Sequence, residues 1–235
     1  MPSTTLHYIY DPFCGWCYAA SPLLAAAQEI SGLQITLHGG GMMSGANRQQ
    51  VTPQLRSYVM QHDATIARMT GQPFGNDYFN GLLQDQDAVF DSSPPITAIL
   101  AANALGSRGL DLLKRIQSAH YVAGRRIADY RVLQELAAEI GLDSVAFRRE
   151  FDTVSGAATE RHIAASRQYL QKVGGSGFPT LVLETDGKFE LLDFGTWLGN
   201  PQGFSQNLKD TLLPVAPVAK AGGFSCTAAG CNLPD

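Results

Sequence analysis

The feature that most constrains the fold is a pair of cysteines, Cys14 and Cys17, in the segment DPFCGWCY at residues 11–18. The apolar, aromatic run 6–10 before them is typical of a β-strand, and the alanine-rich run 14–30 that contains them is typical of a helix. The cysteines are therefore expected in the first turn of a helix that follows a strand. Three uses of such a pair are open at this point: a redox-active dithiol, half of a metal site, or two buried core thiols.

The position of Cys14 favours redox chemistry. Unpaired N–H groups and the helix dipole favour an anion at a helix amino terminus, so the nucleophilic thiolate is stabilised there. Cys17 lies one turn further on the same face and is expected to be the less exposed of the two. We therefore predict that Cys14 attacks and Cys17 resolves the mixed disulfide. Gly15 is expected to leave open space for a substrate backbone, and Trp16 to give an apolar surface beside the sulfur.

The flanking elements predict an α/β fold that is interrupted by helices. A strand within 31–41 completes a βαβ unit, whose two strands should be parallel. Pro22 is expected to kink the first helix or to begin a second segment. The long segment 42–172 has the apolar spacing of several helices, one of them with Ser93 as its N-cap.

Strand signals return late in the chain. Residues 178–185 and 188–194 flank an Asp-Gly pair, which predicts a hairpin. The element order is that of a thioredoxin-like core with a large inserted all-helical domain, in which the late strands join the early sheet. The expected divisions are a core of 1–41 and 173–215, a helical insertion of 42–172, and a flexible tail of 216–235 that carries a second cysteine pair.

At this point the sequence resembles a known family, the DsbA-like thioredoxin-fold oxidoreductases, and in particular their cytosolic FrnE-like branch. The resemblance lies in DPFCGWCY (11–18), in GSGFPTLVL (175–183) and in SSPPITAILAA (92–102), and it extends over nearly the whole chain. It implies that the Phe178–Pro179 bond is cis, faces the cysteines, and positions the substrate. Most X-Pro bonds are trans, so this expectation depends on the resemblance alone.

One position departs from the family pattern. Many thioredoxin-fold enzymes have an acid in the first strand about six residues before the nucleophile, where this chain has Tyr8. Asp11 is nearer to the cysteines, and we interpret it as a turn or capping residue rather than as a proton acceptor. The sequence therefore does not predict a route for the proton of Cys17.

The second pair, Cys226 and Cys231, permits two interpretations. It could be an auxiliary disulfide that exchanges with Cys14 and Cys17, and CTAAGC (226–231) fits members of the resembled branch that carry such a pair. The alternatives are a local bridge or idle thiols. All four cysteines could also form a zinc site, although no purpose would then remain for Pro179.

The composition excludes some classes of binding partner. The formal net charge of −4 gives no basic footprint, so nucleic acid is not an expected partner, and no run is long and apolar enough to cross a membrane. The sequence predicts a cytoplasmic thiol–disulfide oxidoreductase or isomerase that acts on protein or small-molecule disulfides. It is expected to need no bound cofactor or metal, with an external thiol such as glutathione recycling it. A glutathione-dependent transferase or isomerase of the same fold is the main alternative.

Overall fold

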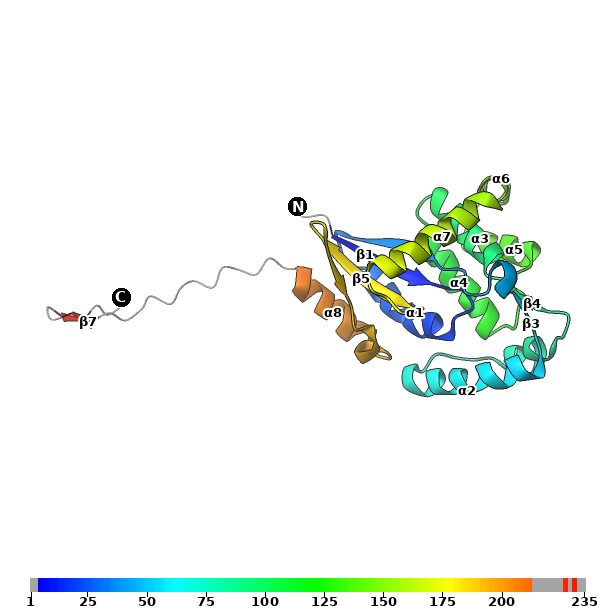
Figure 1. Cartoon of the computed structure of the whole chain (residues 1–235), viewed down its shortest axis with the longest axis horizontal. Coiled ribbons are helices and arrows are strands. Elements are labelled where there is room, and N and C mark those ends of the chain that lie inside the picture. Colours follow the sequence, from blue (N-terminus) through cyan, green and yellow to red (C-terminus); the bar gives the residue numbers. More distant parts are fainter. Residues whose placement is uncertain (1–3, 213–225, 228–229, 232–235) are drawn as a thin grey trace.

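The structure is a computed structural model that describes residues 4–212, 226–227 and 230–231. Its main sheet has the strand order β2–β1–β5–β6 (Figure 1). β1 is parallel to β2, and β5 is antiparallel to both β1 and β6. The predicted βαβ unit and the predicted late hairpin are confirmed, and the late strands join the early sheet. The four strands are Thr4–Tyr10 (β1), Leu33–Gly39 (β2), Thr180–Thr185 (β5) and Lys188–Leu191 (β6).

The alternation of side chains along β1 separates two helical layers. Tyr8 points toward α1 (Gly15–Gln28), where its hydroxyl donates to the Cys17 carbonyl at 3.0 Å. His7 points to the opposite face, where its ring lies 5.1 Å from that of Tyr169 in α7 (Ala157–Lys172). Helix α8 (Pro201–Leu212) packs against α1, so α1 and α8 cover one face of the sheet and α7 the other (Figure 1).

Pro22 lies inside α1, which is one helix from Gly15 to Gln28, so the expected second segment is not found. A proline has no N–H to donate to the carbonyl four residues earlier, which here belongs to Tyr18. The side-chain amide of Gln72 donates to that carbonyl at 2.8 Å. A residue of the inserted region thus replaces the missing helix bond.

Helices dominate the chain between β2 and β5. Thr52 caps the first of them, since its side chain accepts from the N–H of Leu55 at 3.1 Å. The α-helices of this region are Pro53–Thr70 (α2), Ser93–Ala104 (α3), Gly109–Tyr121 (α4), Tyr130–Glu139 (α5), Ser144–Val154 (α6) and α7.

Short elements complete this description. They are the 3-10 helices Gly45–Asn47 (η1), Leu82–Gln84 (η3) and Phe194–Trp197 (η4), the π-helix Asp77–Gly81 (η2), and the strand pairs Gln49–Gln50 (β3) with Val89–Phe90 (β4) and Cys226–Thr227 (β7) with Gly230–Cys231 (β8). The rest of the predicted tail 216–235 lies outside the described residues. None of the helices that the structure describes has both the length and the apolar character needed to cross a membrane.

The predicted N-cap of α3 is wrong by one residue. Ser93 is the first residue of the helix, and Ser92 precedes it. The carboxylate of Asp91 accepts from the Ser93 N–H at 2.9 Å, while the Ser92 side chain is used elsewhere, in a bond to Asp11. A contact between distant parts of the chain, which local sequence does not reveal, therefore decides how this helix begins.

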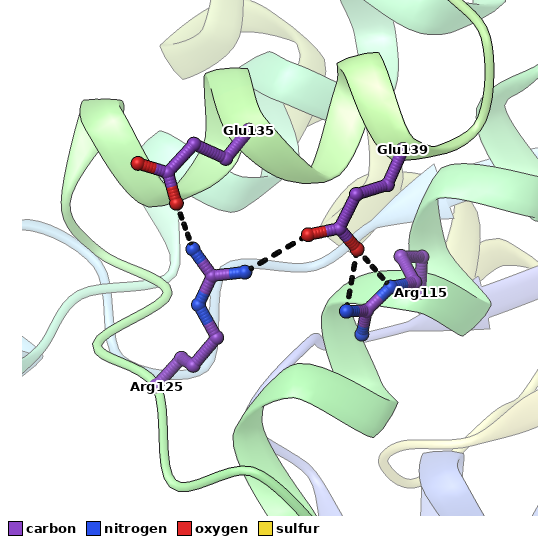
Figure 2. Close-up of polar contacts among 4 residues, drawn as sticks. All are labelled: Arg115, Arg125, Glu135 and Glu139. Atoms are coloured by element: carbon purple, nitrogen blue, oxygen red, sulfur yellow. Dashed lines mark hydrogen bonds and ion pairs between the residues drawn. The ribbon is translucent and has the colours of Figure 1, made fainter.

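An ion-pair network ties α4 to α5 on the surface of the helical region (Figure 2). Glu139 accepts from the Arg115 Nε at 2.5 Å and from the Arg125 Nη1 at 3.2 Å, and Arg125 also pairs with Glu135. Exposed ion pairs each contribute roughly 0–1 kcal/mol, and more when charges share partners as they do here. The network orients α5 without reaching the cysteines.

Candidate active site

The two cysteines lie at the amino terminus of α1, as predicted. Cys14 is the N-cap residue, and its carbonyl accepts from the N–H groups of Cys17 and Tyr18 at 3.0 and 3.1 Å. Cys14 is 6% exposed and Cys17 is 0% exposed, so Cys17 is the less accessible of the pair. Both are free thiols in the structure.

The surroundings of Cys17 hold it in its protonated form. Burial is the main cause that raises the pKa of this thiol, and a hydrogen bond and charge interaction with Cys14 raise it further. The Asp11 backbone N–H donates to the sulfur at 3.4 Å and acts in the opposite direction. In the resting protein, therefore, Cys17 keeps its proton.

The peptide bond between Phe178 and Pro179 is cis and adjoins the cysteines, as the family resemblance implied. The Cys14 thiol donates to the Phe178 carbonyl at 3.4 Å. The Phe178 ring packs on Gly40, where an added Cβ would lie 2.1 Å from two ring carbons. Gly40 thus fixes the place of the segment that faces Cys14.

Replacing Gly40 by alanine is expected to displace the Phe178 ring and to slow disulfide exchange at Cys14, because the new methyl group overlaps the ring. Overpacking of this kind costs about 1–3 kcal/mol of folding free energy. Chemical denaturation and turnover measure the two effects. Gly177→Ala is the matched control, since it adds a methyl group next to Phe178 in open space. Equal effects of both variants would contradict this explanation.

Asp11 is a buried junction between the early strand and the inserted helices. Its carboxylate accepts from the N–H of Phe13 at 2.9 Å, from the N–H of Met42 at 2.6 Å, and from the Ser92 hydroxyl at 3.0 Å. The bond to Phe13 is the turn contact that we predicted. Burial raises the pKa of Asp11 to about 6, against the effect of these donors and of the nearby Arg167 charge.

A groove of about 890 Å³ opens beside Cys14, between α1 and α2. Its wall is mostly apolar and includes Trp16, Phe178 and the sulfur-bearing side chains of Met42 and Met43. Asp63, Tyr78, His120 and Tyr121 also line the groove.

The space beside Gly15 differs from what we predicted. Helix α2 fills it, because an added Cβ would lie 2.9 Å from the Ile66 Cδ1 and 3.0 Å from the Asp63 Oδ1. Gly15 thus permits the close approach of α2 rather than leaving room for a substrate backbone. It still lines the groove.

Comparison with known proteins identifies the architecture. A family model described as the DSBA-like thioredoxin domain matches residues 5–206. The chain belongs to this family. Its fold is accordingly the DsbA-like thioredoxin fold, and the protein is a thiol–disulfide oxidoreductase, as the sequence predicted. A search of curated proteins found no match.

Solved structures agree with this DSBA-like assignment. The cytosolic disulfide reductase DsbM from Pseudomonas aeruginosa is 55% identical, with a TM-score of 0.84 over 88% of this chain and 98% of that chain. A structure of DsbM with GSH matches at 53% identity and a TM-score of 0.83, with the same coverage of 88% and 98%. A putative protein disulfide isomerase from Nitrosomonas europaea is 26% identical, with a TM-score of 0.72 over 90% of this chain and 98% of that chain.

In this DSBA-like chain the structure also brings together residues that sequence reasoning did not group. On the α7 face, His7 contacts His38 at 3.0 Å and Glu184 at 2.8 Å. Burial, together with His7 and His162, lowers the pKa of His38 to about 4. The Nε2 of His162, on α7, accepts from the Gly39 N–H at 3.0 Å.

Metal binding finds no support within the described part of the chain, where no three His, Cys, Asp or Glu side chains are grouped to hold an ion. The zinc hypothesis also needs Cys226 and Cys231. Their backbones stand opposite each other in the β7–β8 pairing, but their side chains lie outside the described residues. The auxiliary redox role of this pair therefore stays a prediction.

Proposed function

We propose that the protein reduces disulfides in the cytosol, with Cys14 as the attacking sulfur and Cys17 as the resolving sulfur. The observation that carries this proposal is the asymmetry of the pair: Cys14 borders the groove, while Cys17 is fully buried behind it. The 55% sequence identity of this protein to a cytosolic disulfide reductase supports reduction as the direction of the reaction and the cytosol as its place.

The reaction follows as two exchanges in which atoms and electrons balance. The Cys14 thiolate attacks one sulfur of the substrate disulfide, so a mixed disulfide forms and the first substrate sulfur leaves as a thiolate that takes up a proton. Cys17 then loses its proton and attacks the Cys14 sulfur. The Cys14–Cys17 disulfide forms, the second substrate thiol leaves, and two electrons have passed from the enzyme to the substrate.

The environment of Cys17 favours its ionisation only after the first exchange has taken place. Part of the upward shift in its pKa comes from the hydrogen bond and charge interaction with Cys14. Both contributions end when the Cys14 sulfur is bonded to substrate, whereas the donated N–H of Asp11 remains. Cys17 therefore ionises more readily in the mixed disulfide than in the resting enzyme.

The residues around Cys14 hold the substrate during these exchanges. Phe178 faces the Cys14 sulfur through its carbonyl, Pro179 follows it across the cis bond, and Trp16 offers an apolar surface on α1. Gly15 keeps α2 close to the site. Core segments 1–41 and 173–215 carry the chemistry in this proposal, and the insertion 42–172 shapes the groove.

Glutathione is the proposed external reductant, supported by the structure of the related DsbM with GSH. Two glutathione molecules would reduce the Cys14–Cys17 disulfide and leave as oxidised glutathione. The test is to equilibrate the protein with glutathione buffers and to measure the disulfide by mass spectrometry. A single two-electron transition, with a potential below about −200 mV, is expected for a reductase. Absence of an intramolecular disulfide at every ratio would contradict the proposal.

A further inference from the structure

The groove beside Cys14 contains a buried carboxylate that neither Lys nor Arg balances. Asp63, on α2, is 3% exposed. Its Oδ2 accepts from the Tyr78 hydroxyl at 2.9 Å, and its Oδ1 lies next to Gly15, one residue from the nucleophile. Neither Lys nor Arg lines the groove, and none of the ion pairs among the described residues includes Asp63.

A buried carboxylate without a cation is costly. The pKa of Asp63 is raised to about 6, chiefly by burial, although the Tyr78 hydroxyl and the charge of His62 act against that rise. At neutral pH the carboxylate is therefore largely ionised and incompletely compensated. A cation that entered the groove would supply the missing partner.

Two further buried atoms of the groove lack partners. The Nδ1 of His120 and the hydroxyl of Tyr121 have no hydrogen-bond partner among the described residues, and both residues line the groove. Burial lowers the pKa of His120 to about 3, so its ring is neutral and one nitrogen can accept a hydrogen bond. The rings of His120 and Tyr121 lie 5.2 and 5.4 Å from that of Tyr78, which holds Asp63.

These groups suit a primary ammonium. Its N–H groups can donate to the Asp63 Oδ1, and its positive charge supplies the partner that this carboxylate lacks. Aromatic side chains surround the same space, and their faces attract cations. A neutral or anionic group would leave the carboxylate uncompensated, or would be repelled by it.

We propose that Asp63 selects small disulfides that carry a primary ammonium close to the sulfur, of the cystamine type, and binds that ammonium while Cys14 attacks. This inference rests on the proposed disulfide reductase activity and names a substrate class for it. Asp63 is thereby a specificity-determining residue that the inserted helix α2 contributes.

The test compares three disulfides of similar size: cystamine, the neutral bis(2-hydroxyethyl) disulfide, and the anionic 3,3′-dithiodipropionate. Asp63→Asn keeps the shape of the side chain and its bond from Tyr78 but removes the charge. We expect it to lower kcat/KM for cystamine about tenfold or more relative to the neutral disulfide, mainly through KM, because a hydrogen bond to a charged group is lost. The kcat/KM of the variant for the anionic disulfide should rise relative to that for the neutral one.

Each comparison uses the ratio of variant to wild type for one substrate, which cancels differences in intrinsic reactivity. Asp77→Asn is the matched control, since it removes an exposed carboxylate one residue from Tyr78 and should not change the order of the substrates. Tyr78→Phe removes the hydroxyl that holds the Asp63 pKa down, so its preference for cystamine should appear at higher pH than in the wild-type protein. If Asp63→Asn lowers kcat/KM equally for all three disulfides, the inference is overturned and the reductase function stays intact. A wild-type protein inactive on every disulfide would overturn the function itself.

Discussion

Replacing Cys14 by serine is expected to lower kcat/KM for disulfide reduction by at least about a thousandfold, since the reaction loses its nucleophile. Cys17 cannot take over, because it is fully buried behind Cys14 and its pKa is raised. Substrate-dependent consumption of reductant, followed with a neutral small disulfide, measures the effect. Activity within tenfold of wild type in Cys14→Ser would remove the proposed mechanism.

Cys17→Ser should behave differently from Cys14→Ser. The first exchange still occurs, so the variant reacts once with a disulfide and then stalls as a mixed disulfide, and turnover continues only as fast as external thiol releases it. A burst of one thiol per enzyme molecule, followed by a rate that depends on glutathione concentration, is the expected kinetic pattern. The two variants together separate attack from resolution, which a single substitution cannot do.

The second large effect concerns Asp11 and the pH dependence of stability. The pKa of Asp11 is raised from 3.8 to about 6 by burial. Between those values the folded protein binds more protons at this carboxyl than the unfolded chain, so its contribution to the free energy of unfolding falls as pH rises. The shift corresponds to about 3 kcal/mol of the free energy of unfolding. This stabilisation is present below pH 4 and is lost above pH 6.

Asp11→Asn removes this titration while keeping an acceptor for the N–H of Phe13. The difference in unfolding free energy, wild type minus variant, is expected to fall by about 2.4 kcal/mol between pH 4 and pH 7, as measured by urea denaturation of the reduced protein. The contributions of Asp63 and other carboxyls cancel in this difference. Asp77→Asn makes the same change of net charge at an exposed position. A difference that stays constant or rises with pH would contradict the assignment.

Much of the fold could be predicted because local signals agreed with each other. The strand before Cys14, the helix after it and the Asp-Gly turn each follow from short segments, and in the hairpin Asp186 and Gly187 both take the positive φ that such a turn needs. The cis bond at Pro179 was expected only through family resemblance, since most X-Pro bonds are trans.

The features that sequence missed all depend on contacts between distant segments. Ser93 was predicted as the N-cap of α3, but Ser92 holds that position, and its hydroxyl is bonded to Asp11, 81 residues away. The space beside Gly15 is filled by α2, and the sequence near Gly15 does not predict this packing. Asp63 was overlooked because it is one polar residue on an amphipathic helix, and only the packing of α2 on α1 places it beside Gly15, next to Cys14 in the chain.

The most direct test of the central claim is to trap the first intermediate. Cys17→Ser, reduced and then exposed to oxidised glutathione, should gain the mass of one glutathione, and peptide mapping should place it on Cys14. Cys14→Ser, treated in the same way, should gain no adduct on Cys17, because that sulfur is out of reach. The contradicting result has two parts. Cys17 carries the adduct in the wild-type protein or in Cys14→Ser, and Cys14 stays unmodified in Cys17→Ser. That result would reverse the assignment of attacking and resolving sulfurs.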